Sequence, residues 1–150
     1  MEYITHRFSD PATLIDRVHT VFENWEEKES LPGCLDEDIV HRLKLAIHEW
    51  LANLVQHADF RDRRPEISIT VRALRNGIEC AIEDNSEGFD LNGQLTAKPD
   101  VIDAFPERGM GLLMIKACTE HLDYEELTNM RHRLQFIVSS DRDPWLNIPF

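Results

Sequence analysis

Three polar side chains recur at four-residue steps in the apolar stretch LAIHEWLANLVQHADF, namely Glu49, Asn53 and His57. On a helix they lie along one flank of an apolar face, and the row drifts by about 80° over roughly 12 Å, from the solvent side toward the core. Each one alone is typical of a surface residue beside a core stripe. The row of three favours the lining of a pocket. The apolar face is predicted to consist of Leu43, Ile47, Trp50, Leu54 and Ala58.

Asp84 follows a predicted strand, IECAIED, in which Ile78, Cys80 and Ile82 alternate with polar residues. Period-two alternation places Asp84 on the same buried face, at the end of the strand. A carboxylate there needs a hydrogen-bond donor. Two interpretations are open: Asp84 caps the turn in DNSEG, or it accepts from the amino group of a ligand, with Gly88 allowing close backbone approach.

Gly109 and Gly111 stand immediately before a predicted helix in ERGMGLLMIK. The free amide groups and the positive dipole end of such a helix bind phosphate oxygens, and Arg108 adds a positive charge. Two glycines before a helix also occur in ordinary tight turns. The order along the chain favours phosphate binding: the helix row, the strand-end Asp, a long segment, then the Gly-x-Gly helix.

The sequence does not contain the motifs of a zinc protease, a P-loop or a CxxC site. HEWLA begins like the zinc signature HExxH, but Ala52 stands where the second His is required, and no stretch matches GxxxxGK[ST]. Cys34, Cys80 and Cys118 form no CxxC pair and are predicted to be reduced, packed thiols.

The composition of the chain indicates its size class and the kinds of partner that it does not bind. The 150 residues amount to about one domain, and 42% hydrophobic with 29% charged residues is ordinary for a globular protein. Sixteen Lys and Arg against twenty-eight Asp and Glu give a net charge of −12, which repels nucleic acids and anionic membranes. The start MEYITHRFSD has no apolar core of a signal peptide, and no apolar run approaches the roughly 18 residues of a spanning helix. We therefore expect a soluble, cytoplasmic protein that binds neither nucleic acid nor membrane directly.

The elements that must position these residues follow from hydrophobic periodicity. Between the two hairpins the periodicity vanishes for about twenty-five residues, a length typical of a functional lid. The order predicts an α/β fold, a two-layer sandwich with about three helices on one face of a mostly antiparallel sheet. The predicted elements are strand 3–8, helix 10–29, helix 36–58, strands 66–74 and 78–84 around a turn at Asn76-Gly77, helix 110–122, and strands 123–128 and 134–140 around a turn at 129–131.

EWLANLVQH resembles the N-box of the histidine-kinase-like (GHKL, Bergerat-fold) ATPases, DNSEGFD their first glycine box and ERGMGLLMIK their second. The chain is most similar to the small single-domain form, the serine-protein kinases that serve as bacterial anti-sigma factors. The resemblance covers roughly Asp36 to Ser139 and implies one domain over residues 1–150 with an ATP lid at about 91–108. Ser86 stands where the DxGxG pattern has its first glycine, so its side chain would lie beside the base.

The resemblance also implies a role for each position. Asn53 would be the Mg²⁺ ligand, and Glu49 the base that orients or deprotonates the attacking hydroxyl. Asp84 would accept from the adenine amino group, with Gly88 beside the ring. His57 is interpreted as a packing or hydrogen-bonding residue. The residues that would hold phosphates are Arg108, Gly109 and Gly111.

The function that this resemblance implies is an ATP- and Mg²⁺-dependent kinase of a serine on a STAS-domain antagonist, in a partner-switching pathway that regulates transcription. It also implies a sigma factor as second partner, and a homodimer. The alternative is a regulatory module that binds proteins with or without nucleotide and has no kinase activity, for which Ser86 is the sequence hint. The catalytic domain of a two-component histidine kinase would need a helical hairpin with an acceptor His, and the roughly thirty-five residues before the N-box helix contain none.

Overall fold

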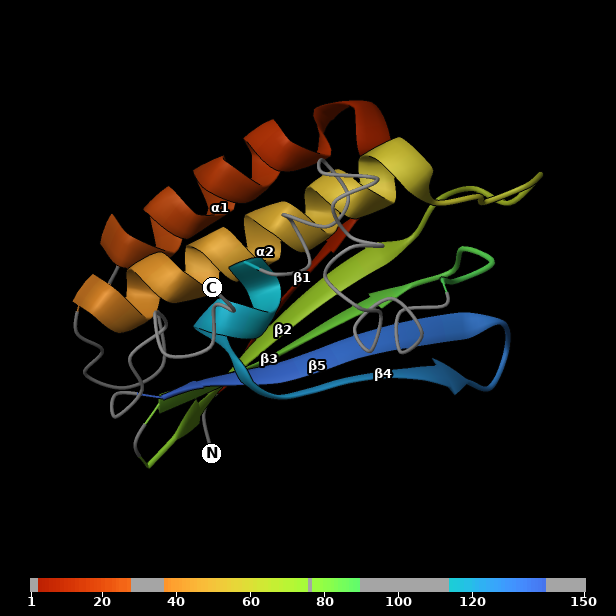
Figure 1. Ribbon diagram of the computed structural model, residues 1–150. Coiled ribbons are helices and arrows are strands. Elements are labelled where there is room, and N and C mark those ends of the chain that lie inside the picture. The colour runs from red at the N-terminus through yellow and green to blue at the C-terminus, as the bar shows by residue number, and fades with distance from the viewer. Residues whose placement is uncertain (1–2, 28–36, 76, 90–113, 140–150) are drawn as a thin grey trace.

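A computed structural model describes residues 3–27, 37–75, 77–89 and 114–139 of the chain. Its described part has two layers, with helices on one face of an antiparallel sheet (Figure 1). The predicted two-layer α/β sandwich is confirmed. The helices are α1 (Leu14–Glu27), preceded by the 3-10 turn η1 (Pro11–Thr13), and α2 (Glu37–His57), and residues 114–118 are also helical. The strands are β1 (Tyr3–Phe8), β2 (Ile67–Leu74), β3 (Gly77–Asp84), β4 (Glu120–Leu127) and β5 (Arg131–Ser139).

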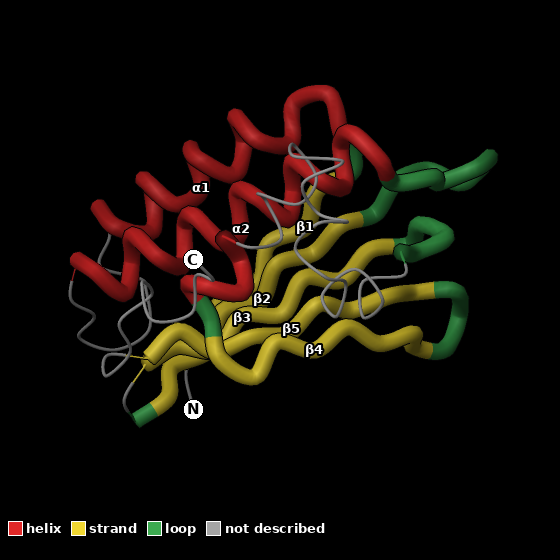
Figure 2. The backbone as a smooth tube through the Cα atoms, viewed as in Figure 1, coloured by secondary structure: helices red, strands yellow, loops and turns green. Residues whose placement is uncertain are grey.

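The sheet has the order β1-β2-β3-β5-β4, and every neighbouring pair is antiparallel. Strand β5 therefore lies between β3 and β4, although β4 precedes it in sequence. Figure 2 shows that the loop after α2, the residues after β3 and the turn between β4 and β5 all lie at one end of the sheet. Asp84 pairs in register with His132, so it lies at that end.

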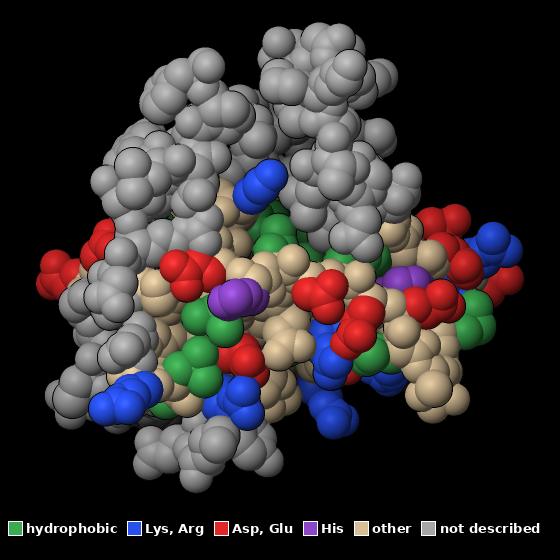
Figure 3. Space-filling model, turned by 60° about the horizontal axis from the view of Figure 1, so that its bottom comes forward, with side chains coloured by type: hydrophobic (Ala, Val, Ile, Leu, Met, Phe, Trp, Pro, Cys, Tyr) green, Lys and Arg blue, Asp and Glu red, His purple; other side chains and the backbone are tan. Residues whose placement is uncertain are grey.

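The core lies between the helices and the sheet, because each strand turns alternate apolar side chains toward α1 and α2. Strands β2, β3 and β5 contribute Ile69, Ile82 and Phe136, all at most 1% exposed. Trp50 of α2 is fully buried against them. The other sheet face carries mixed charges that pair across strands, as in Arg72–Glu79 at 2.8 Å and Arg133–Glu125 (Figure 3).

Helix α2 begins within one residue of its predicted start, whereas α1 begins at Leu14, four residues after the predicted start, because residues 11–13 form a 3-10 turn. Asp10 accepts hydrogen bonds from the Ala12 amide at 3.0 Å and the Thr13 hydroxyl at 3.2 Å, so it caps the first turn before α1. Helix α2 starts at Glu37, within one residue of the predicted start, with Glu37 and Asp38 where the dipole favours acids. None of the helices that the structure describes is long and apolar enough to cross a membrane.

Three other predicted boundaries are wrong. Gly77 is the first residue of β3, paired with Leu74, and not part of the turn. The sequence needs a glycine there because a Cβ atom would lie 2.2 Å from the carbonyl oxygen of Val138. The third helical segment ends at residue 118 and β4 begins at Glu120, three residues before the predicted start. Strand β5 likewise begins at Arg131, because left-handed Asn129 and Met130 complete the turn before it.

Candidate functional site

Asp84 ends β3 with a carboxylate that is fully buried. One oxygen, Oδ1, accepts from the Ser86 amide at 2.9 Å and from the Ser86 hydroxyl at 2.5 Å. The other, Oδ2, has no hydrogen-bond partner among the residues that the structure describes. Burial raises the pKa of Asp84, and the Ser86 bonds and the nearby His132 partly counter that rise. The site thus holds a buried acceptor to which none of the described residues donates, which is costly unless a ligand supplies the hydrogen bond.

Aromatic side chains from α2, β4 and β5 pack together near the end of β3, and two of them, Tyr124 and His132, interact electrostatically with Asp84. The Trp50 ring of α2 lies edge-on to Tyr124 of β4, with centroids 5.5 Å apart, and to Phe89, at 5.6 Å. The Tyr124 ring stacks on His132 of β5 at 5.7 Å. The Tyr124 hydroxyl accepts from the Phe89 amide at 3.2 Å, and burial and the charge of Asp84 raise its pKa, so it stays neutral. Apolar walls around one free acceptor suit a flat heteroaromatic ring that carries an amino group.

Gly88 takes a left-handed conformation, with φ of 83°. A Cβ atom there would lie 2.4 Å from Nε2 of His132. The structure therefore gives two reasons of its own for a glycine: the backbone angle and the imidazole beside it. The predicted place of Gly88 beside a ligand ring stays a prediction.

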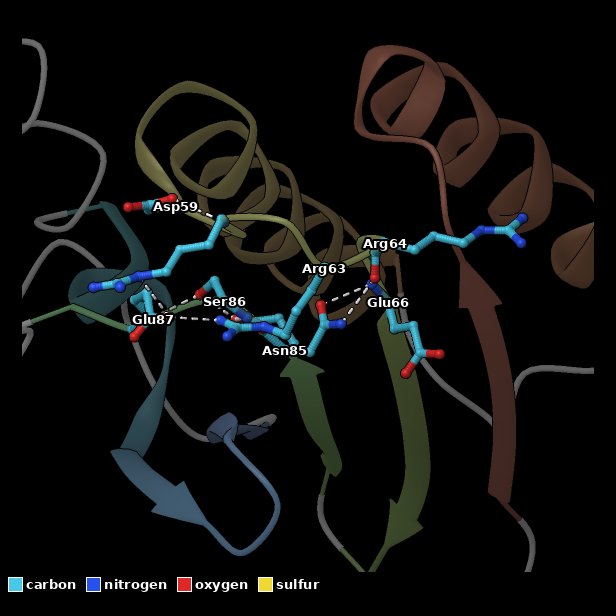
Figure 4. Close-up of polar contacts among 10 residues, drawn as sticks. Asp59, Arg63, Arg64, Glu66, Asn85, Ser86 and Glu87 are labelled. Carbon is cyan, nitrogen blue, oxygen red and sulfur yellow. Dashed lines mark hydrogen bonds and ion pairs between the residues drawn. The ribbon is translucent and has the colours of Figure 1, made fainter.

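The loop between α2 and β2 holds the residues that follow Asp84 (Figure 4). Asn85 accepts from the Glu66 amide at 2.9 Å and donates to the Arg64 carbonyl at 2.9 Å, so its side chain bridges to the start of β2. Arg63 donates to the Asn85 carbonyl at 2.8 Å and to the Glu87 carboxylate at 2.9 Å. We call these bonds the loop clasp. It fixes the backbone on both sides of Ser86.

A further bond ties this turn to the end of α2. The amide of Glu87 donates to the carbonyl oxygen of Asp59 at 2.8 Å, two residues after the helix ends. Arg61, which has a left-handed φ of 53°, forms a second ion pair with Glu87 at 2.9 Å. The helix that carries Glu49 and Asn53 is thereby connected to the turn after Asp84.

Glu49 and Asn53 of the helix row are half-buried on α2. Their predicted place beside the ligand stays a prediction. His57 is exposed, so the predicted drift of the row toward the core is wrong. The physical reason is that α2 ends at His57, beyond Leu54, its last buried residue.

The predicted phosphate-binding residues Arg108, Gly109 and Gly111 lie outside the described residues, as does the predicted lid at about 91–108. No three His, Cys, Asp or Glu side chains of the described ranges are grouped so as to hold a metal ion. The predicted Mg²⁺ ligand Asn53 is half-buried on α2 and carries an amide oxygen, a type of donor that Mg²⁺ accepts, and its role stays a prediction.

Sequence reasoning missed four residues of the site, which are Trp50 as a wall, Phe89, Tyr124 and His132. A signal existed for His132: counting back by two from the buried Val138, Phe136 and Leu134 places it on the inner face. For Tyr124 the available signal was weaker, a single aromatic residue within the acidic stretch DYEEL.

Comparison with known proteins finds similarity over most of the chain. The family described as the histidine kinase-like ATPase domain matches residues 9–137. A serine-protein kinase RsbW of Bacillus cereus (strain AH820) is 30% identical over 92 residues, a match that covers 57% of this chain and 56% of the relative. The RsbW of Bacillus thuringiensis (strain Al Hakam) matches to the same extent. The matched region thus spans a little over half the length of these relatives.

Proposed function

The chain belongs to the histidine kinase-like ATPase family, and from this premise we propose that it is an ATP-dependent serine-protein kinase. The observation that carries the proposal is the buried Oδ2 of Asp84, an acceptor that receives no hydrogen bond from the described residues and lies near Tyr124 and His132. The exocyclic amino group of adenine is a donor of the kind that this oxygen lacks. The similarity to proteins named serine-protein kinase RsbW supports the choice of a serine as phosphoryl acceptor.

In this proposal one group of residues binds the adenine ring and another binds the Mg²⁺ ion and the phosphates. Asp84 accepts from the adenine amino group, and Trp50, Phe89 and Tyr124 exclude water around it. Asn53 holds the Mg²⁺ ion, which when bound supplies positive charge to the phosphates. Gly88 lies beside the ring, and phosphates are held by Arg108, Gly109 and Gly111.

Glu49 is the proposed base. The hydroxyl oxygen of the acceptor serine forms a bond to the γ-phosphorus, the bond from that phosphorus to the β–γ bridging oxygen breaks, and ADP leaves. The serine proton passes to the Glu49 carboxylate. Glu49 lies one helical turn before Asn53 and is half-buried, so it can approach a substrate without occupying the base site.

The proposed partners follow the resemblance. A STAS-domain antagonist would carry the acceptor serine, a sigma factor would be the second partner, and the kinase would form a homodimer in the cytoplasm. Residues 1–150 would form one domain whose lid spans about 91–108. The net charge of −12 argues against direct binding to nucleic acid.

Phosphoryl transfer in the Glu49→Ala variant tests the proposal. Protein is incubated with radiolabelled ATP, Mg²⁺ and a candidate STAS-domain protein encoded nearby, and ADP affinity is measured by calorimetry. Loss of a general base should slow transfer by about 10²- to 10⁴-fold. Affinity should stay within a few fold, because Glu49 does not touch the nucleotide in this arrangement.

Two controls sharpen this experiment. Glu23→Ala removes an exposed carboxylate from α1 and should transfer at the wild-type rate. Asn53→Ala should weaken Mg²⁺-dependent binding and transfer together. Wild-type transfer by Glu49→Ala would refute its role as base. Tight nucleotide binding without transfer by the unaltered protein would favour the alternative, a nucleotide-binding regulatory module without kinase activity.

A further inference from the structure

Ser86 occupies the position where the related sequence pattern has a glycine, and its hydroxyl donates a hydrogen bond to Asp84. We propose that Ser86 is a positioning residue: its hydroxyl holds Oδ1 of Asp84, so that Oδ2 alone faces the ligand and acts only as an acceptor. Ser86 thereby selects a purine with an amino group over one with a carbonyl oxygen at the same place. The inference rests on the proposed nucleotide site.

The hydrogen bonds of Ser86 leave little freedom. The side chain is 1% exposed, and its hydroxyl donates to Oδ1 at 2.5 Å while it accepts from the Gly88 amide at 3.1 Å. The Ser86 amide donates to the same Oδ1 at 2.9 Å. Two donors thus converge on one carboxylate oxygen and none of the described residues donates to the other. With a glycine here, Oδ1 would keep one donor, and the carboxylate could turn more freely about its broad terminal torsion.

The hydrogen bonds from Ser86 also influence whether the Asp84 carboxyl group is protonated or ionised. Burial favours the neutral acid, whereas donors to Oδ1 favour the carboxylate. Two other titratable groups act on Asp84 from the packed strands: His132 of β5, which favours the carboxylate, and Tyr124 of β4, whose hydroxyl stays neutral. A protonated Asp84 would donate to a ligand carbonyl, as guanine presents, whereas the carboxylate accepts from the amino group of adenine. Removal of the Ser86 hydroxyl should therefore reduce the preference of the site for adenine over guanine.

The bonds between Ser86 and Asp84 also explain how the Ser86 side chain fits the site. A serine that pointed into the base site would crowd a bound ring, and Ser86→Gly would then raise the affinity. The structure turns the hydroxyl toward Asp84 instead, so the same substitution should lower the affinity. The two arrangements predict opposite signs for one variant.

The first experiment needs no nucleotide. The carboxyl carbon of Asp84 is followed by ¹³C NMR during a pH titration, and its resonance is assigned by its loss in Asp84→Asn. The titration midpoint should move to higher pH in Ser86→Ala and in Ser86→Gly, and should stay near the wild-type value in Ser86→Thr, which keeps the hydroxyl. Ser86→Gly is the second hydroxyl-free variant because the glycine of the related pattern is compatible with this turn. An unchanged midpoint in both hydroxyl-free variants would overturn the inference.

The second experiment measures ADP and GDP binding by calorimetry at several pH values. Ser86→Ala should bind ADP about 2- to 10-fold more weakly, because the carboxyl group that Ser86 no longer holds must be ordered when ADP binds. Its preference for ADP over GDP should narrow, and the pH at which ADP binding is lost should rise. Tighter ADP binding by Ser86→Gly would overturn the inference. A wild-type protein that binds neither nucleotide would refute the proposed function, while the titration without nucleotide still decides whether Ser86 controls Asp84.

Discussion

Replacement of Asp84 by Asn tests the base site most directly. The amide keeps one oxygen for the Ser86 donors, but its NH₂ group then occupies the place of Oδ2 and meets the amino group of adenine, donor against donor. A hydrogen bond to a charged group contributes about 1.5–3 kcal/mol. At about 1.4 kcal/mol per factor of ten, Asp84→Asn should bind ADP about 10- to 150-fold more weakly.

The stability of the free protein should change in the opposite direction. Burial raises the pKa of Asp84 above its ordinary value of 3.8, so between the two values the native state binds more protons than the unfolded state. The free energy of unfolding therefore falls as the pH rises from about 3.8 through the folded pKa, and stays lower above it. Asn does not ionise and lacks this loss. Without nucleotide, the variant should be more stable than the wild type at neutral pH, and the difference should shrink on acidification.

Calorimetry with ADP and thermal unfolding from pH 4 to pH 8 measure both effects on the same samples. Asp62→Asn, an exposed position in the loop after α2, is the matched control and should change neither quantity. Unchanged ADP affinity in Asp84→Asn would show that Asp84 only caps the turn. If Asp84→Asn were less stable than the wild type at neutral pH, the claim that the buried Asp84 carboxylate lowers the free energy of unfolding would be refuted.

Three further predictions concern the supports of the site. Gly77→Ala should destabilise the fold by about 1–3 kcal/mol, because its Cβ would lie 2.2 Å from the Val138 carbonyl oxygen; a melting temperature equal to that of the wild type would contradict the close approach of β3 and β5. Tyr124→Phe should cost about 1 kcal/mol in chemical denaturation, because the Phe89 amide loses its acceptor; no change would mean that water replaces the hydroxyl. Arg63→Ala should weaken ADP binding, although Arg63 does not contact the nucleotide in the proposed arrangement, because the turn after Asp84 loses its bonds from Arg63 to Asn85 and Glu87. Wild-type ADP affinity in this variant would show that the turn keeps its shape without Arg63.

The features that could be predicted from the sequence are those that depend on short-range patterns of apolar and polar residues. Apolar side chains at helical spacing and an acidic first turn placed α2 to within one residue at each end, and period-two alternation placed Asp84 on the buried face of β3. The convergence of Tyr124 and His132 on Asp84 could not be predicted in the same way. It depends on β5 lying between β3 and β4, and no pattern within either strand specifies its neighbour. The loop clasp was missed for a related reason, because Arg63 and Asn85 are 22 residues apart and each resembles an ordinary loop residue.

The loop clasp has a consequence for amide hydrogen exchange. Surface loops usually exchange early because their amide groups face water. Here the Glu66 amide donates to Asn85 within the clasp, and the Glu87 amide donates to the Asp59 carbonyl oxygen beside it, so neither amide can exchange until these bonds open. The loop after α2 and the turn after β3 should therefore exchange as one cooperative unit. A nucleotide that binds at Asp84 would slow exchange in a loop some twenty residues earlier in the chain, where it makes no contact.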